Sequence, residues 1–197
     1  DEGEPIKKYD ISDNIVLITV DSQWFLEDWN DHVYINEESE IQNRTLFFLE
    51  FENQIKKAQG KIKIVAIHHP IETYTKQGLI GNTAGPTVQD YQNKQYRALR
   101  NRLKTIARQN ENIIFVSGHD KNLQYINNRV PQLISAAAGT TEKVKDGGDG
   151  NFTTSNNGYA RLDIDTDGKV TAYFFTLENG VSRPVFNTTV LKGGEEE

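Results

Sequence analysis

Residues 112–121 read Asn-Ile-Ile-Phe-Val-Ser-Gly-His-Asp-Lys, an apolar run followed by a glycine and three polar residues. The apolar part is rich in β-branched and aromatic residues and predicts a buried strand. A second run of this kind, Ile62–Ile67, ends in His68-His69-Pro70. In an α/β protein the carboxyl ends of parallel strands meet at one edge of the sheet. The sequence therefore predicts that His68 and His119 lie close together at that edge.

Two predicted helices separate these strands from one another and from a third apolar run, Ile15–Val20. Ser39-Glu-Ile-Gln42 has the form of a capping box, so the first helix is expected to begin there and to end near Gly60. The second helix is expected from about Val88 to Arg108. Strands that alternate with helices in this way favour a parallel sheet. The buried stripe of the first helix is expected to contain Ile41, Phe48 and Ile55, widened by Leu49 and Phe51. The buried stripe of the second helix is expected to contain Tyr96, Leu99, Leu103 and Ile106.

After Ser117 the pattern changes to short strands with little helix between them. Asp165-Thr-Asp-Gly168 is a hairpin signal between two of them. Such a meander predicts a second, more antiparallel sheet packed against the first, with helices outside. We expect one domain over residues 1–197, with residues 1–10 and 192–197 as loose ends. The predicted strands are Leu123–Ile126, Gln132–Ser135, Tyr159–Ile164, Val170–Thr176 and Val181–Val190.

The composition limits the classes of function. The 197 residues suffice to bury the core of one large domain, and 25% of them are charged, as in a globular protein. The net charge of −6 argues against a general attraction to nucleic acid or to anionic membranes. No apolar stretch approaches the roughly 20 residues of a membrane span. Cysteine is absent, which excludes disulfides and thiolate metal sites.

Three of the four histidines, His68, His69 and His119, directly follow predicted strands. Neutral imidazole is a common ligand for zinc, iron and manganese. Successive side chains of a strand point to opposite faces, so at most one of His68 and His69 is expected to bind an ion directly. From the spacing alone, a metal site and a polar rim at the sheet edge both remain open.

Three stretches of the sequence resemble the calcineurin-like metallophosphoesterases, especially their purple-acid-phosphatase-like branch. They are Val20-Asp-Ser-Gln-Trp24, Ala66-Ile-His-His-Pro70 and Val116-Ser-Gly-His-Asp-Lys-Asn-Leu-Gln-Tyr125. The family hallmark is Gly-His-x-His, commonly Gly-His-Asp-His-Asn-Leu-Gln-Tyr, and this chain matches it at every position but one. The glycine-containing Ala136-Ala-Ala-Gly-Thr-Thr141 also fits that branch. The resemblance spans roughly residues 14–176 and implies a four-layer α/β/β/α sandwich.

In that family two metal ions activate a water molecule that attacks a phosphate ester. The resemblance implies that His68 and His119 bind one metal, iron, zinc or manganese in an active protein, and that His69 and Asp120 lie near the site. Lys121 stands where the family's second histidine binds the other metal. A charged ammonium group has no lone pair and repels a cation, so this substitution removes a ligand.

The family's upstream motifs, Asp-x-His, Gly-Asp and Gly-Asn-His, are not found in this sequence. The chain therefore resembles the C-terminal portion of the fold, without its N-terminal βαβ units. Methionine is absent even at position 1, which indicates a processed or trimmed chain or a part of something longer. Together with the family branch, this favours an exported or cell-envelope-associated protein.

Three functions remain open, and no catalytic residue is assigned. The chain could be a catalytically degenerate domain that serves as a structural or interaction module with other protein chains. It could be part of an active two-metal phosphatase that hydrolyses phosphate esters, with its remaining ligands on an N-terminal half or on another chain. It could also be an α/β binding domain with histidines at a pocket rim. Lys121 favours the first function, and the intact His68 and His119 favour the second.

Overall fold

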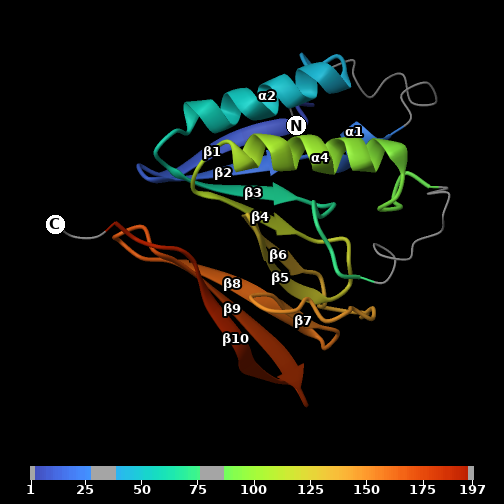
Figure 1. The fold of residues 1–197 in the computed structure, drawn as a ribbon, viewed down its shortest axis with the longest axis vertical. Helices are drawn as coiled ribbons and strands as arrows, with labels where there is room; N and C mark the ends of the chain where they lie inside the picture. The colour runs from blue at the N-terminus through green and yellow to red at the C-terminus, as the bar shows by residue number, and fades with distance from the viewer. Residues whose placement is uncertain (1–2, 28–38, 76–86, 195–197) are drawn as a thin grey trace.

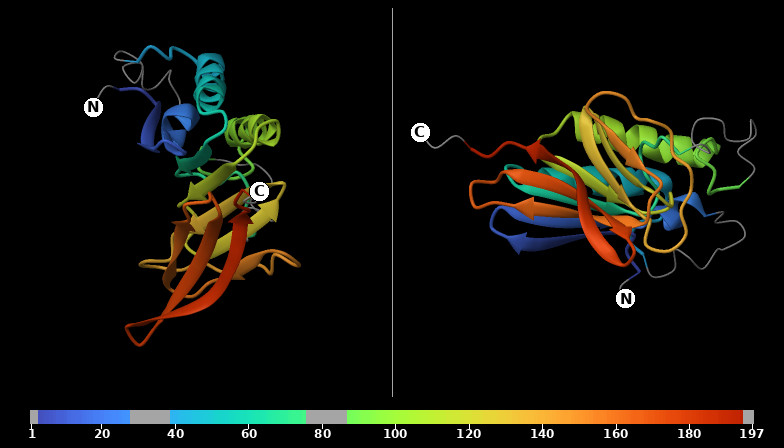
Figure 2. Two further views of the ribbon diagram at one scale, coloured as in Figure 1. Left: turned by 90° about the vertical axis from the view of Figure 1, so that its left-hand side faces the viewer. Right: turned by 90° about the horizontal axis from the view of Figure 1, so that it is seen from below.

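The computed structural model describes residues 3–27, 39–75 and 87–194 (Figure 1). A seven-stranded sheet carries helices on one face and a three-stranded sheet on the other (Figures 1 and 2). The strand order is β1-β2-β3-β4-β6-β5-β7 in the first sheet and β10-β9-β8 in the second. The helices are α1 (Ser22–Leu26), α2 (Arg44–Lys57) and α4 (Lys94–Arg108). The strands are β1 (Ile6–Ser12), β2 (Ile15–Val20), β3 (Ile62–Ile67), β4 (Ile113–Ser117), β5 (Leu123–Asn128), β6 (Val130–Ser135), β7 (Phe152–Thr154), β8 (Gly158–Ile164), β9 (Val170–Glu178) and β10 (Val181–Leu191).

The expected parallel arrangement of the three apolar strands is confirmed. Strands β2, β3 and β4 are neighbours and all run in the same direction. Val20 pairs with Ile67, and Ile67 pairs with Ser117, so the three strands end at the same level. The segments that follow them therefore leave the sheet side by side.

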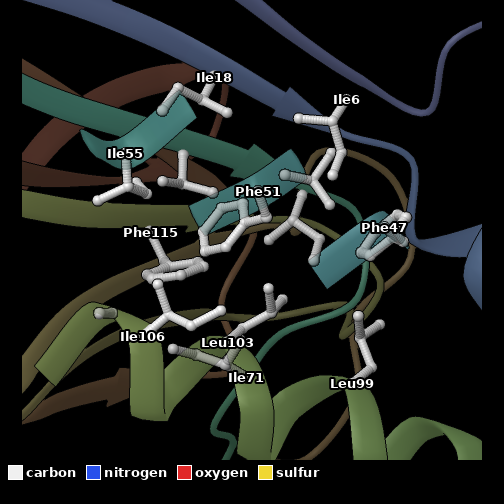
Figure 3. Packing of buried hydrophobic residues seen from close by; sticks show 14 of the residues in the cluster. Ile6, Ile18, Phe47, Phe51, Ile55, Ile71, Leu99, Leu103, Ile106 and Phe115 are labelled. Carbon is white, nitrogen blue, oxygen red and sulfur yellow. The ribbon is translucent and has the colours of Figure 1, made fainter. Parts of the chain in front are cut away.

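Two hydrophobic cores lie on opposite faces of the first sheet. The core on the helical face contains Phe51 of α2 and Leu103 of α4 against Phe115 of β4 (Figure 3). The core on the other face contains Ile114 of β4 and Phe174 of β9. Neighbouring residues of β4 thus serve different cores, because side chains alternate across a strand. This two-sided burial explains why the strand is a continuous apolar run.

The predicted start of the first helix is wrong. Asn43 caps α2, because its Oδ1 accepts hydrogen bonds from the backbone N–H groups of Thr45 and Leu46 at 3.0 and 2.9 Å. Ser39 instead forms a local turn, in which its Oγ accepts from the N–H of Ile41 at 3.0 Å. Asparagine is as good a cap as serine, so the sequence offers two competing start signals, Ser39 and Asn43, within one helical turn of each other. The buried stripe shifts accordingly to Phe47, Phe51 and Ile55.

The second helix is also shorter than predicted, because α4 begins at Lys94 with Asn93 as its cap. Its predicted buried stripe of Tyr96, Leu99, Leu103 and Ile106 is confirmed. The expectation that residues 1–10 form a loose end is wrong, because β1 pairs with β2 as the edge of the first sheet.

The short strands after Ser117 are divided between the two sheets, which corrects their assignment to the second sheet alone. Strand β6 pairs parallel with β4, and β5 then pairs antiparallel with β6. Only β8, β9 and β10 form the second sheet. In the part of the chain that the structure describes, helices cover one sheet alone, so three layers are present, and no described helix is long and apolar enough to cross a bilayer.

Candidate metal centre

Three histidines meet at the carboxyl ends of β3 and β4. The ligand atoms of His68, His69 and His119 all lie within 4.8 Å of one another. The ring centroids of His68 and His119 are 5.3 Å apart, which confirms the proximity predicted from the strand pattern. His68 is exposed, His119 is partly exposed and His69 is buried.

Gly118 allows this close approach. Its backbone N–H donates to the carbonyl oxygen of His68 at 3.1 Å, which joins the two strand ends. A Cβ atom at position 118 would lie 3.3 Å from Nδ1 of His68, tighter than most real contacts. His119 then adopts a positive φ of 63°, a conformation that few non-glycine residues take. The Gly-His pair is therefore a geometric requirement of the histidine group.

Both ring nitrogens of His69 are occupied by hydrogen bonds. Nε2 faces Oε1 of Gln89, and the amide nitrogen of Gln89 donates to Gln23 at 2.7 Å. An amide oxygen only accepts, so Nε2 of His69 carries the proton and Nδ1 accepts from the hydroxyl of Ser22 at 2.8 Å. In this arrangement His69 has no free lone pair for an ion. The expectation that His68 and His69 point to opposite faces is wrong, because their ligand atoms lie within 4.8 Å of each other.

The surroundings of His68 and His69 favour their neutral forms. Burial lowers the pKa of His69 to about 4. Loss of hydration also lowers the pKa of His68, and the neighbouring His119 lowers it further, against the opposing charges of Asp120 and Asp21. Because only a neutral imidazole has a lone pair for a cation, the electrostatics of His68 suit a metal ligand at neutral pH.

Asp120 does not belong to the histidine group. Its buried carboxylate accepts a hydrogen bond from the hydroxyl of Thr73. Gln124 also donates to the Thr73 hydroxyl, at 3.1 Å, and accepts from the backbone N–H of Tyr74 at 2.9 Å. This polar network fastens residues 71–75 to the strand that follows Asp120. The sequence analysis missed it, although a buried glutamine within an otherwise apolar strand is a signal of such a network.

We expect Thr73→Val to lower the free energy of unfolding by about 1–3 kcal/mol, because it leaves the buried Asp120 carboxylate without its partner. Thr73→Ser keeps the hydroxyl group and should lose markedly less. Urea denaturation of the two variants and the wild-type chain measures the difference. Equal stability of Thr73→Val and wild type would show that the network carries no net stabilisation.

Lys121 lies at the surface. Its side chain is 51% exposed, and its ammonium nitrogen is 3.6 Å from Oε1 of Glu142. The backbone reinforces this pairing, since the N–H of Glu142 donates to the carbonyl oxygen of Lys121 at 2.7 Å. Glu142 was not foreseen from the sequence, because it is distant along the chain and belongs to no recognisable motif. The lysine charge is thus paired with a surface carboxylate.

The donor set fits one metal ion better than two. Among the described residues, the group that could hold an ion consists of the three imidazoles, without a carboxylate. With His69 engaged at both nitrogens, His68 and His119 remain as ligands for a single transition-metal ion. A dinuclear centre needs several ligands for each ion, and carboxylates commonly bridge them. The described residues do not meet that requirement.

Comparisons with known proteins give a likeness of fold without a close relative. No family model and no curated protein matches the sequence. A solved structure titled "GAP50 the anchor in the inner membrane complex of Plasmodium" aligns over 98% of this chain and 54% of its own, with a TM-score of 0.64 and 16% identity. A structure of PhoD aligns over 96% of this chain and 44% of its own, with a TM-score of 0.60 and 10% identity.

The chain thus spans about half the length of the structures that it matches. The identities are too low to transfer an activity, but the alignments cover nearly all of this chain. Both likenesses show a shared fold that includes the strands around His68 and His119. The chain therefore has a fold like that of these two solved structures, with a histidine group that could bind a metal.

Proposed function

We propose that this chain is a catalytically degenerate metallophosphoesterase-like domain that acts as a structural or interaction module. The observation that carries the proposal is the donor set at the strand ends. Three imidazoles gather there, and one of them, His69, is hydrogen-bonded at both nitrogens. Two remaining imidazoles supply too few ligands for two ions that would activate a water and stabilise a leaving oxygen.

Lys121 supports the same proposal. At this position the resemblance expects a histidine for the second ion, and the chain has an ammonium group paired with Glu142. A protonated lysine offers donors but no lone pair, so it cannot replace the missing imidazole. The module would keep the fold and the His68–His119 pair without the chemistry of the dinuclear centre.

A second candidate function is part of an active phosphatase that hydrolyses phosphate esters. It is favoured by the open position of His68 and by the length of the solved structures, of which about half has no counterpart here. An N-terminal half or another chain would then supply the remaining ligands for iron, zinc or manganese. It would also supply the fourth layer of the expected α/β/β/α sandwich, over the outer face of the second sheet.

We also infer that the protein is exported or associated with the cell envelope. GAP50, whose structure this chain resembles, is described as the anchor in the inner membrane complex of Plasmodium. A role as an anchoring or interaction module at such a location agrees with a fold that is retained without its catalytic centre.

Metal titration of the purified 197-residue chain tests the proposal. We expect at most one equivalent of zinc or manganese, lost in His119→Ala and in His68→Ala, because each variant removes one of two available ligands. We also expect no turnover of an aryl phosphate with either metal. Circular dichroism of both variants controls for folding.

Two bound equivalents together with turnover would refute the degenerate function and favour the enzyme. A Lys121→His variant sharpens the comparison, since it restores the expected ligand type at one position. If the centre lacks several ligands, as proposed, this variant should remain inactive.

A further inference from the structure

A buried network of polar side chains joins the two segments that carry His68 and His119. The first segment runs from His68 into residues 71–75, and the second runs from His119 into β5. The hydroxyl of Thr73 in the first segment donates to the carboxylate of Asp120 in the second, and both side chains are buried. Because Asp120 directly follows His119, this hydrogen bond holds the chain next to a candidate ligand.

The network has a second link, between Thr75 and Asn122. Nδ2 of Asn122 donates to the Thr75 hydroxyl at 2.9 Å. Gln124 connects the two links, because its Nε2 donates to Oδ1 of Asn122 at 2.7 Å and to the Thr73 hydroxyl at 3.1 Å. Asn122 and Gln124 are fully buried, so these hydrogen bonds are shielded from water. A buried network in which each side chain has a partner holds its members in one arrangement.

The backbone of His119 needs such support. Its φ of 63° is a conformation that few non-glycine residues take and that persists only where the surrounding structure determines it. The N–H of Asp120 donates to the carbonyl oxygen of Gly118 at 2.8 Å, which closes a tight three-residue turn around His119. On one side of this turn, Gly118 is bound to the backbone of His68. On the other side, Asp120 is held by Thr73. The network therefore supplies one of the two anchors of the turn.

We propose that this network positions His119 against His68 and thereby sets the affinity of the histidine pair for a transition-metal ion. The inference rests on the proposed function, in which the pair is kept without a dinuclear centre, and it names the residues that keep it. Thr73 and Thr75 are positioning residues, because their hydroxyl groups act on the segments beside the histidines and not on an ion. Ligands that are already held in place bind a metal more tightly than ligands that must first be brought together. Loss of a group that orients metal ligands typically lowers metal affinity by about 10–100-fold.

Zinc titration against a chromophoric chelator compares the wild-type chain with Thr73→Val and Thr75→Val. Each substitution keeps the branched shape of the side chain and removes the hydroxyl that belongs to the network. We expect each to raise the dissociation constant for zinc by about tenfold or more. Thr176→Val is the matched control on β9, since the Thr176 hydroxyl is buried without a hydrogen-bond partner among the described residues. It should leave the zinc affinity unchanged.

Val170→Ala separates positioning from a general loss of stability. Val170 is fully buried in the core between the two sheets, so its truncation destabilises the chain without removing a hydrogen bond of the network. The folded fraction of this variant should bind zinc as tightly as wild type. Circular dichroism establishes that each variant is folded before the titration.

The spacing of the two imidazole rings is measured without any metal. The ring centroids of His68 and His119 are 5.3 Å apart, so we expect a nuclear Overhauser cross-peak between their ring protons in the metal-free wild-type chain. The cross-peak should lose intensity in Thr73→Val and Thr75→Val. It should be retained in the two control variants, since neither alters the network.

Unchanged zinc affinity or an unchanged cross-peak in both network variants would overturn the inference. A wild-type chain that binds no zinc or lacks the cross-peak would overturn it as well, and so would Val170→Ala if it weakened zinc binding as much as the network variants do. Metal stoichiometry and phosphatase activity are measured on the same wild-type samples. Two equivalents together with turnover contradict the proposed function, whereas the outcomes above contradict the positioning role alone.

Discussion

Replacing Phe51 with alanine is expected to lower the free energy of unfolding by about 3–5 kcal/mol. The Phe51 ring is fully buried between α2 and the first sheet and lies 6.5 Å from the ring of Phe115 (Figure 3). Removal of the ring leaves a cavity lined by side chains of a sheet and two helices. These elements cannot easily move together to fill the cavity. Guanidinium denaturation followed by circular dichroism measures the loss.

Leu49→Ala is the matched control on the same helix. Leu49 was predicted to belong to the buried stripe, but its side chain is exposed, so the variant should stay within about 0.5 kcal/mol of wild type. A loss of similar size in both variants would mean that α2 packs through a different face from the one described.

Gly158→Ala is expected to lower the free energy of unfolding by about 3 kcal/mol or more, because the added Cβ atom would overlap a backbone carbonyl oxygen. A Cβ at this position would lie 1.9 Å from the carbonyl oxygen of Phe175, its neighbour on β9. It would also lie 3.0 Å from a methyl group of Leu123. Because β8 joins the two sheets at this point, relief of the clash requires the strands to separate. Thermal unfolding should show a markedly lower midpoint or no cooperative transition.

Gly139→Ala controls for the general effect of adding a methyl group to a glycine. A Cβ at position 139 meets no atom within 4 Å, so this variant should have nearly the stability of wild type. A stable Gly158→Ala chain would contradict the close contact between β8 and β9 at this position.

The strands were predictable because their signal is local. Runs such as Ile62–Ile67 and Ile113–Ser117 are apolar on both faces, and only a strand buried between two layers requires that composition. The start of α2 was not predictable in the same way. Ser39 and Asn43 are both suitable caps, and the choice depends on Glu4, whose carboxylate accepts from the Ser39 hydroxyl at 3.0 Å and holds that residue outside the helix.

The candidate site shows the same division. The positions of His68 and His119 followed from strand ends, since parallel strands in register bring their successors together. The hydrogen bonds of His69 to Ser22 and Gln89 could not be predicted, because these residues come from three separate segments that meet only in the folded chain. Lys121 was recognised as an altered position, but its pairing with Glu142 was not.

The sequence alone determined the three apolar strands from Ile15 to Ser117, their parallel arrangement and the meeting of two histidines at their ends, because periodicity and strand ends are properties of neighbouring residues. The tertiary structure decided how the later strands divide between two sheets, which histidine has both ring nitrogens hydrogen-bonded and how residues 71–75 are held against β5. Each of these depends on contacts between residues distant along the chain, and such contacts leave no pattern within a short stretch of sequence.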